Sequence, residues 1–568
     1  MHRDNLLLNR RPIALTSFEL WMVDSSSIDR KIANPLKSCD KTTSLLTGGN
    51  EILTYFSNVA VREESLSWDN ISDAIMFHGT RYPDRPAVID GNDQINAAAF
   101  AALVGQAAVY LRGLGIAEGD LIGIALVNSI NHLILFFGLL RIGATTLHIA
   151  PAGADAAVLV RRYDISAMFI EPDAPDTGAG QEIRIGLHWR DKLLKHHGDA
   201  RTARDAAACL QVSLTSGSTG IPKGIVCTHR QRIARAEANE RLYQGRWSRD
   251  RPPAFLLTMS ICDAGFVQYL FNQVLMGGPV VILPYVHHPS DFVRMIAGHK
   301  DAVCVATPDM CRSFLAFAAT APERILLPGL RALISVGLPL RAEEKRRLAR
   351  HVNPFFYDAY GTAGFGMVSA LLPDEVADHA QTVGRPAAGA VVEVVDRNGL
   401  ILPPGVAGQV RCRGPTMAQG WLADGKAWLS GELFRDGYYY IGDIASIGAD
   451  GYITLKGRQD DLIRRHRQEF HPHEVENVIA AHPLVREAAV TARPAASGHG
   501  SEIVAYVVLS GALPLYELAS HCVTWLPLSK RPAKIIYAAA LPRTPNGKLD
   551  RPAIRALAER PTGVFCAP

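Results

Sequence analysis

Short apolar runs alternate with longer helical segments between Ser67 and Val336, and this alternation constrains the fold more than any other feature. Runs such as Leu121–Leu126 and Leu330–Val336 have the length and composition of buried strands. The segments between them, such as Asn96–Leu114, are long enough to form helices. Strands that alternate with helices imply parallel sheets in an α/β architecture.

The pattern changes after Gly389 to short apolar runs separated by Gly and Pro, which is typical of a small antiparallel unit or barrel. A new α/β segment begins at His473, with the boundary near Gly457–Asp461. Residues 1–66 show no sustained period and predict an N-terminal extension. We therefore predict this extension, a large domain of stacked α/β sheets plus a small β unit over 67–457, and a small α+β C-terminal domain over 458–568.

Composition disfavours several classes of protein. A formal net charge of +4 is small for 568 residues, and no dense Lys/Arg stripe occurs, so we expect no nucleic-acid partner. Nine cysteines without a C-x-x-C pair are typical of reduced thiols in the cytoplasm. The N-terminus lacks the apolar core of a secretory signal. Arg141 interrupts the most apolar stretch, His132–Pro151, which favours a buried helix followed by a strand over a membrane span.

The stretch Val212–Gly224 reads V-S-L-T-S-G-S-T-G-I-P-K-G and predicts a strand that enters a loop and returns to regular structure. Its hydroxyls and glycine N–H groups can approach an anion closely, and Lys223 adds a positive charge, so the loop is suited to phosphate. It is not a Walker A loop, because Pro222 stands where that motif has glycine. A flexible Ser/Gly surface loop is the commoner alternative, but the Pro-Lys-Gly ending disfavours it.

Residues Thr215–Gly224 resemble the signature loop of the adenylate-forming superfamily, which includes acyl-CoA synthetases, luciferases and peptide-synthetase adenylation domains. Four later blocks resemble that family in the same order: Asp358–Gly364, Tyr440–Asp443, Gly457–Asp461 and Leu541–Arg551. The resemblance begins near residue 70 and implies a large domain followed by a small, mobile C-terminal domain.

The resemblance also implies roles for individual residues. It assigns Tyr360 to stacking on adenine, Asp443 to the ribose hydroxyls, Asp460 to the interdomain hinge and Lys548 to catalysis, by bridging the substrate carboxylate and the α-phosphate. Thr215 is the candidate metal contact. The implied nucleotide-binding residues are Thr215, Ser216, Gly217, Ser218, Thr219, Gly220, Lys223, Tyr360, Gly361, Thr362, Asp443 and Arg458.

Two positions depart from the family pattern. Gly364 stands where the family usually has a glutamate that helps to hold Mg²⁺, so metal binding is expected to be weaker or to depend on water and phosphate. Arg467 replaces a glycine beside the family's pantetheine tunnel, and Glu469 reverses the expected charge. A solvated charged turn explains the second departure equally well. The residues therefore support the prediction of adenylation more strongly than the prediction of transfer to CoA.

The predicted acyl pocket follows Thr258 and includes Asp263, Phe266 and Gly337, with Val267, Ser335 and Leu338 as further candidates. Asp263 loosely resembles the aspartate with which amino-acid-activating members hold the substrate amine. Helix N-capping is the slightly favoured alternative for this residue. The apolar surroundings favour a hydrophobic acid of modest size.

These features predict an ATP-dependent carboxylic acid ligase that forms an acyl-adenylate, releases pyrophosphate and passes the acyl group to CoA. ATP and Mg²⁺ are the expected cofactors, and CoA is the expected co-substrate. One alternative is a stand-alone adenylation enzyme that serves a phosphopantetheine carrier protein or an amine acceptor. Another is a nucleotide-binding homologue with little catalysis, motivated by Gly364, Arg467 and Glu469.

Overall fold

The computed structural model describes most of the chain from Trp68 to Glu559. The residues outside this description are 1–67, 152–155, 203–205, 216–222, 244–245, 248, 250, 285, 287, 423–427, 430–432, 466–467, 496–500, 544–548 and 560–568. The side chains of residues 215, 428 and 429 also lie outside it.

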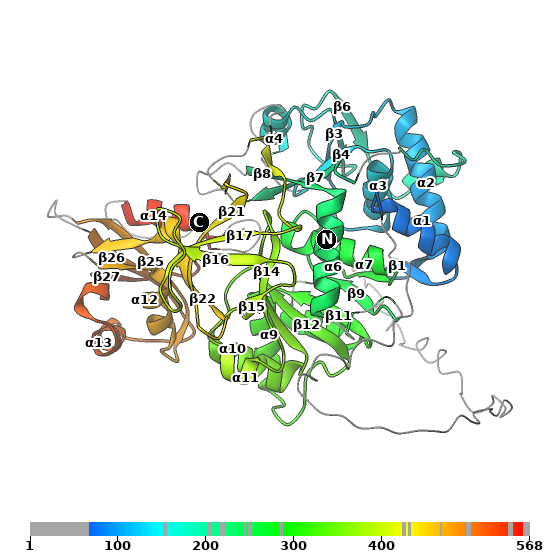
Figure 1. Ribbon diagram of the computed structural model, residues 1–568. Helices are drawn as coiled ribbons and strands as arrows, with labels where there is room; N and C mark the ends of the chain where they lie inside the picture. The colour runs from blue at the N-terminus through cyan, green and yellow to red at the C-terminus, as the bar shows by residue number, and fades with distance from the viewer. Residues whose placement is uncertain are drawn as a thin grey trace, which may run out of the picture. The chain divides into compact units, whose positions relative to one another are not determined.

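Among the described residues, the larger sheet has the strand order β15-β14-β13-β12-β11-β9-β10-β1-β2 (Figure 1). Its strands are β1 (Pro86–Asp90), β2 (Asp93–Asn96), β9 (Ala254–Leu257), β10 (Val280–Ile282), β11 (Ala302–Ala306), β12 (Leu330–Val336), β13 (Phe356–Thr362), β14 (Gly366–Leu371) and β15 (Arg385–Pro386). The run from β1 to β13 through β10, β9, β11 and β12 is parallel, and β2, β14 and β15 pair antiparallel at the two edges. The predicted parallel architecture is confirmed.

A second sheet, within the described residues, has the order β19-β18-β8-β7-β4-β3-β5-β6. Its strands are β3 (Leu121–Ala125), β4 (Thr145–His148), β5 (Ala167–Ile170), β6 (Gln181–Arg184), β7 (Cys209–Thr215), β8 (Lys223–Thr228), β18 (Gly420–Leu422) and β19 (Trp428–Leu429). The five neighbouring strands β6, β5, β3, β4 and β7 are parallel, whereas β8 pairs antiparallel with β7. The predicted helix and strand over His132–Pro151 are confirmed as α3 (Ile130–Arg141) and β4.

Side-chain caps fix the starts of several helices. The Asn96 side chain accepts a hydrogen bond from the Ala99 N–H at the start of α2, and Ser129 does the same for α3. Thr228 and Gln231 form a reciprocal capping box at α6. Besides α3, the helices before residue 380 in the described part of the chain are α1 (Ser72–Arg81), α2 (Ala97–Gly113), α4 (Ala156–Tyr163), α5 (Trp189–Leu193), α6 (His229–Leu242), α7 (Ala264–Met276), α8 (Pro289–Ala297), α9 (Pro308–Ala318), α10 (Ala342–Arg347), the π-helix η1 (Leu348–Val352) and α11 (Val376–His379).

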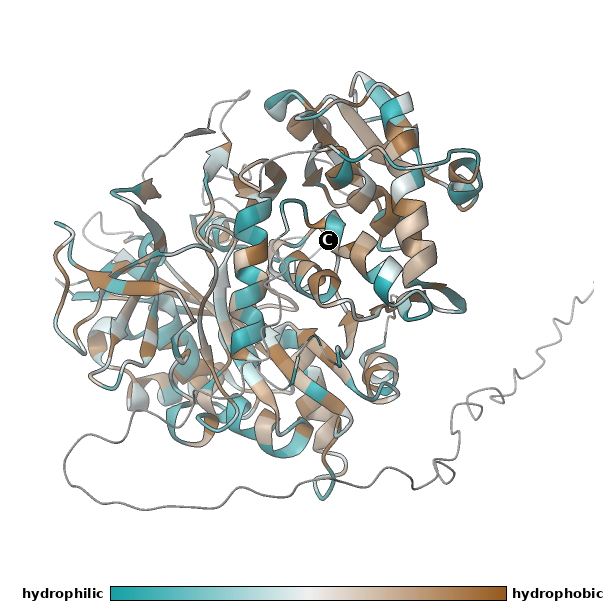
Figure 2. Ribbon diagram, turned by 45° about the vertical axis from the view of Figure 1, so that its right-hand side comes forward, coloured by the Kyte–Doolittle hydropathy of each residue, from teal (hydrophilic) through white to brown (hydrophobic). Residues whose placement is uncertain are grey.

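The largest hydrophobic core joins the two sheets through α7. Leu270 and Phe271 of α7 pack in one cluster with Phe169 of the eight-stranded sheet and Val303 of the nine-stranded sheet. Figure 1 shows α6 and α7 between these sheets. Most of α7 is hydrophobic, whereas α6 is hydrophilic along much of its length (Figure 2). The stacked α/β layers predicted for this part of the chain are therefore present.

A five-stranded antiparallel sheet follows, within the described residues, in the order β16-β17-β21-β20, with β22 paired to β21. Its strands are β16 (Val391–Val395), β17 (Gly408–Arg413), β20 (Phe434–Arg435), β21 (Tyr438–Ile447) and β22 (Ile453–Arg458). The predicted antiparallel unit is confirmed. Strand β21 buries alternate side chains along much of its length, namely those of Tyr439, Ile441, Asp443 and Ala445.

The last part of the chain has its own core, in which Val475, Ile479, Val490 and Leu518 pack together. Its elements are η2 (Gln459–Asp461), β23 (Ile463–Arg465), β24 (Gln468–Phe470), α12 (Pro472–Ala480), β25 (Val485–Pro494), β26 (Ser501–Leu509), α13 (Leu515–Trp525), η3 (Leu528–Lys530), β27 (Lys534–Tyr537) and α14 (Arg551–Glu559). The predicted fold, a large α/β domain followed by a small α+β domain, is confirmed. The borders at 66/67 and 457/458 stay predictions.

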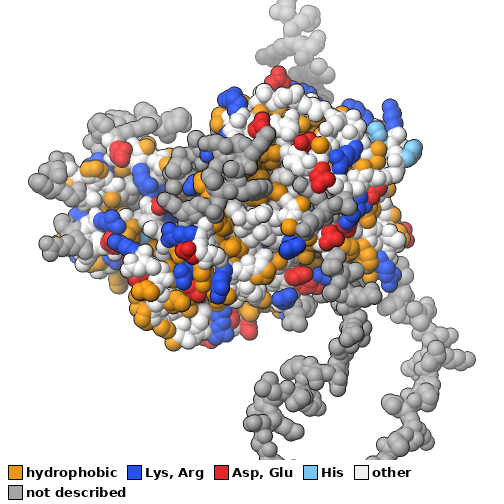
Figure 3. Space-filling view, turned by 45° about the horizontal axis from the view of Figure 1, so that its top comes forward, with side chains coloured by type: hydrophobic (Ala, Val, Ile, Leu, Met, Phe, Trp, Pro, Cys, Tyr) orange, Lys and Arg blue, Asp and Glu red, His pale blue; other side chains and the backbone are white. Residues whose placement is uncertain are grey.

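The surface has no single dominant charge on the face drawn in Figure 3, where basic and acidic side chains are interspersed. Within the described residues, no helix combines the length and apolar character needed to cross a membrane.

Candidate active site

Strands β7 and β8 flank the phosphate-loop candidate. Thr215 ends β7, Lys223 begins β8, and the two residues are opposite each other in the antiparallel register. The predicted strands on both sides of the loop are therefore confirmed. Ser216, Gly217, Ser218, Thr219 and Gly220 lie outside the described residues, as does the side chain of Thr215. Their nucleotide and metal contacts stay predictions.

Lys223 is placed by an aromatic residue that the sequence analysis missed. Its ammonium lies 5.2 Å from the ring centroid of Trp421, an arrangement that the quadrupole of the ring favours. Trp421 belongs to β18, which pairs with β8 so that Trp421 is opposite Ile225. Gly224 is needed beside Lys223, because a Cβ there would lie 2.6 Å from the Cγ1 of Val212.

Three sequence blocks converge at Asp443. The hydroxyl of Tyr360, on β13, donates a hydrogen bond of 2.5 Å to Asp443 Oδ2 on β21. The Nε of Arg458, at the end of β22, lies 3.3 Å from Asp443 Oδ1. Asp443 and Arg458 are direct partners in the β21–β22 register. The structure thus brings together Tyr360, Asp443 and Arg458, which were predicted from three separate blocks to contact adenine, ribose and ribose or phosphate.

Burial dominates the electrostatics of this cluster. Burial raises the pKa of Asp443 above its ordinary value, although the charge of Arg458 and the hydrogen bond from Tyr360 oppose that rise. Burial, with the neighbouring Asp443 carboxylate, raises the pKa of Tyr360 well above its ordinary value. Tyr360 is therefore a neutral hydrogen-bond donor at neutral pH, and Asp443 is an acceptor that two neighbours hold in a fixed orientation.

Gly361 and Thr362 end β13 at a tight turn. A Cβ on Gly361 would lie 2.6 Å from the carbonyl oxygen of Gly366, so the close approach of the two strands requires glycine. The Thr362 hydroxyl accepts a hydrogen bond from the Phe365 N–H at 3.2 Å. In the part of the chain that the structure describes, no group of three or more His, Cys, Asp or Glu residues could hold a metal ion.

Asp460, the predicted hinge residue, is exposed within η2. Arg555 of α14 donates a hydrogen bond of 3.1 Å to the Asp460 carbonyl and pairs with the Asp461 carboxylate. Lys548, the predicted catalytic residue, lies outside the described residues. The two ends of its loop are described, and Arg543 pairs with Leu549 in an antiparallel bridge.

The predicted acyl-pocket residues occupy different environments. The Asp263 side chain accepts a hydrogen bond of 2.7 Å from the Gly265 N–H at the start of α7, which confirms the N-cap interpretation. Phe266 is buried in the main core. Gly337 follows β12 with φ +103°, and a Cβ built on it would meet no atom within 4 Å. The pocket itself stays a prediction.

Two buried arginines on α6 were also missed by sequence reasoning. The Nη2 of Arg232 donates to Gln211 Oε1 at 2.6 Å and to Ser213 Oγ at 2.9 Å, and both acceptors are on β7. Arg235 donates to the carbonyl oxygen of Thr416 at 2.9 Å and to that of Ala363 at 3.1 Å. The arginines thus contact the strand before the phosphate loop and the turn after Tyr360. Their three-residue spacing places both side chains on one face of α6 but does not by itself indicate burial.

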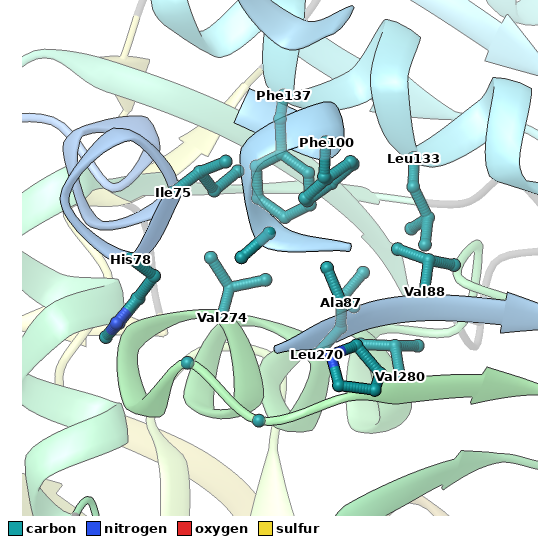
Figure 4. A pocket seen from close by; sticks show the side chains of 14 residues that line it. Ile75, His78, Ala87, Val88, Phe100, Leu133, Phe137, Leu270, Val274 and Val280 are labelled. Carbon is teal, nitrogen blue, oxygen red and sulfur yellow. The ribbon is translucent and has the colours of Figure 1, made fainter. Parts of the chain in front are cut away.

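An apolar cavity lies away from these residues. Ile75, Phe100, Phe137 and Val274 converge on it from α1, α2, α3 and α7, with His78 at its edge (Figure 4). Its lining contains none of Asp263, Phe266 and Gly337, so it is not the predicted acyl pocket.

Comparison with protein families gives two matches along the chain. The model of the family described as "AMP-binding enzyme" matches residues 77–422. The model described as "AMP-binding enzyme C-terminal domain" matches residues 474–548.

Similar proteins differ in length and in what their names describe. The AMB antimetabolite synthetase AmbB of Pseudomonas aeruginosa is 28% identical over 499 residues, which are 84% of this chain but only 38% of that synthetase. The long-chain-fatty-acid–CoA ligase FadD13 of Mycobacterium tuberculosis is 27% identical over 509 residues, 86% of this chain and 98% of the ligase. This chain thus spans less than half the length of the first relative and nearly the whole length of the second.

A solved structure has the same fold. The o-succinylbenzoate coenzyme A synthetase from Bacillus subtilis, in complex with ATP and a magnesium ion, matches with a TM-score of 0.74 and 21% identity. The match covers 84% of this chain and 98% of the synthetase chain.

Proposed function

The chain belongs to the AMP-binding enzyme family, and from that premise we propose that it is an ATP-dependent carboxylic acid ligase. It joins the carboxylate of a small hydrophobic acid to the α-phosphate of ATP, releases pyrophosphate and transfers the acyl group to CoA. The reaction takes place in the cytoplasm. Mg²⁺ accompanies ATP, as it does in the complex of the o-succinylbenzoate coenzyme A synthetase.

The convergence of Tyr360, Asp443 and Arg458 carries this proposal. Asp443 lies in the middle of β21, is buried and has two carboxylate oxygens, which suit a pair of vicinal ribose hydroxyls. When ribose binds, its hydroxyls replace the hydrogen bond from Tyr360, whose ring then stacks on adenine. Arg458 supplies charge beside the ribose and phosphate. Positioning and charge stabilisation of this kind are the main protein contributions to phosphate-centred reactions.

Lys223 and the hydroxyls of the adjoining loop hold the triphosphate in this proposal, and Lys548 stabilises the charge that develops between the carboxylate and the α-phosphate. The hinge at Asp460 lets the small domain, residues 458–568, change its position between the two half-reactions. Gly337 and the start of α7 border the acyl pocket.

Substrate-dependent exchange of radiolabelled pyrophosphate into ATP tests the first half-reaction. We expect exchange with one or more aliphatic or aromatic acids of modest size, and none without an acid. No exchange across a broad panel of acids would rule out the ligase and favour the nucleotide-binding homologue with weak catalysis. The glycine at position 364 is the observation behind that second candidate.

Analysis of the product identifies whether CoA, a carrier protein or an amine accepts the acyl group. We expect a thioester when CoA is added to an exchange-active acid. Thioester formation only on a phosphopantetheinylated carrier protein, or amide formation only with an amine, would replace CoA by that acceptor. The similarity both to a CoA ligase and to a much longer synthetase makes this comparison necessary.

A further inference from the structure

The ring of Tyr439 occupies the space beside Gly364. A Cβ built on Gly364 would lie 2.4 Å from Tyr439 Cζ and 2.6 Å and 2.8 Å from its Cε2 and Cε1. These contacts are far shorter than van der Waals separation, so no side chain fits at position 364 while the ring stays in place. The backbone of Gly364 does not adopt the left-handed region. The neighbouring ring, rather than the backbone conformation, is therefore what requires glycine.

Tyr439 cannot move aside easily. It is 6% exposed and is the second residue of β21, where it pairs with Cys412 on one side and Phe434 on the other. Its ring centroid is 4.7 Å from that of Phe434. Position 364 is also fixed, because its carbonyl oxygen accepts a hydrogen bond of 2.8 Å from the Ala418 N–H.

The polar side chain beside position 364, the Tyr439 phenol, is un-ionised at neutral pH. Burial raises the pKa of Tyr439 to about 12, although a hydrogen bond with the Thr362 side chain opposes that rise. Mg²⁺ prefers carboxylate and phosphate oxygens, and an un-ionised phenol is a poor ligand for it. The nearby carboxylate of Asp443 already contacts Tyr360 and Arg458. The described residues at this turn therefore do not fit a protein-held magnesium ion.

We propose that Tyr439 and Gly364 form a matched pair that closes the position from which a carboxylate at residue 364 would hold the metal, so that ATP binds this chain without a metal ligand from that turn. Any divalent cation is then held by the phosphate oxygens and water. This inference rests on the proposed binding of ATP and concerns how the same site handles its metal.

A double-mutant cycle tests the matched pair without nucleotide. We expect Gly364→Ala to lower the Tm by about 3 to 10 °C in the wild-type background, because overpacking a rigid core is destabilising. The same substitution should cost much less in a Tyr439→Ala background, where the ring is gone. Gly113→Ala is the matched control, because a Cβ there meets no atom within 4 Å. An unchanged Tm for Gly364→Ala, or an equal loss in both backgrounds, would overturn the pair.

Calorimetric titration with α,β-methylene-ATP tests the consequence for the metal. We expect the affinity of the wild-type chain to change by less than about threefold between EDTA and saturating Mg²⁺. The variant Gly364→Glu/Tyr439→Ala should bind the analogue at least about tenfold more tightly with Mg²⁺ than with EDTA, because it restores a carboxylate and the space for it. If Mg²⁺ raises the affinity of the wild-type chain as much as that of the double variant, the inference about the metal is refuted and the proposed function is not affected. No binding in either condition would instead refute the proposed function.

Discussion

Asp443 is subject to opposing influences, and their balance sets how the site responds to pH. Burial raises its pKa, whereas the Arg458 guanidinium at 3.3 Å and the Tyr360 hydroxyl at 2.5 Å stabilise the ionised form. Ribose recognition in the proposed function needs the ionised carboxylate. Nucleotide affinity should therefore fall on acidification at a higher pH than an ordinary aspartate would give.

The substitution Arg458→Met tests this balance. Removing the positive charge raises the pKa of Asp443 further, so protonation begins at a higher pH and the acid limb of the affinity profile moves toward neutrality. At pH 7 we expect AMP to bind about three- to tenfold more weakly. Titration calorimetry from pH 5 to 8 measures both effects. The exposed, paired Arg464 supplies the control Arg464→Met, which should leave the profile unchanged. An unmoved acid limb in Arg458→Met would contradict the coupling.

Lys548 gives a second test at the residue scale. Replacing it by alanine removes the cation proposed between the carboxylate and the α-phosphate, so pyrophosphate exchange should fall by at least about 100-fold. Binding of ATP should change little, because Lys223 and the Asp443 cluster remain. Exchange kinetics and calorimetry on the same variant separate the two effects. Comparable exchange in Lys548→Ala and the wild-type chain would remove this lysine from its proposed role.

Motifs could identify Tyr360, Asp443 and Arg458 from the sequence, but not the contact of all three within one cluster. Tyr360 and Asp443 are 83 residues apart in the chain and lie in different sheets, and pairing between β21 and β22 sets the Asp443–Arg458 geometry. Tyr439 was not predictable either. It is one of three successive tyrosines, and only the strand register decides which of them faces Gly364.

At the scale of elements, α6 shows where pattern reasoning is incomplete. Its sequence H-R-Q-R-I-A-R-A-E-A-N-E-R-L is rich in charge, which on average indicates a solvated helix. Yet Arg232 and Arg235 are 1% and 3% exposed. Helix formation itself was predictable, because the Thr228–Gln231 capping box marks the start. Burial of the arginine face was not, because the acceptors are on β7 and in the segments around Ala363 and Thr416.

The substitution Arg235→Met tests whether α6 positions the turn after Tyr360. It leaves the carbonyl oxygens of Ala363 and Thr416 without their guanidinium donor, which should cost about 2 to 4 kcal/mol of stability. The KM for ATP should rise more than kcat falls, because the turn after Tyr360 loses its hydrogen bond from Arg235. Chemical denaturation and exchange kinetics measure these effects. Arg241→Met is the control, because that side chain is 65% exposed on the same helix. Equal effects of both substitutions would contradict a positioning role.

At the scale of the whole molecule, the alternation of strands and helices was enough to predict a large α/β domain and a smaller domain after it. The two-domain outline was predictable because each part has its own apolar pattern and its own core. The pairing of β8 with β18, which are about 200 residues apart in the chain, was not, because strand partners depend on long-range register. That pairing brings Trp421 to Lys223.

Function at this scale depends on whether η2 acts as a hinge. Proline fixes φ near −65°, which the short 3-10 turn at Asp460 accommodates but a rotated arrangement need not. The backbone hydrogen bond that closes this turn uses the Leu462 N–H, so proline at 460 leaves its donor in place. We therefore expect Asp460→Pro to retain one half-reaction and to slow the other by at least about tenfold. Pyrophosphate exchange and thioester formation, measured on the same preparation, report the two halves separately. Asp460→Ala removes the same carboxylate without restricting φ, so this variant should perform both half-reactions. A proline variant with an unchanged Tm that performs both half-reactions at wild-type rates would show that the rotation is centred elsewhere.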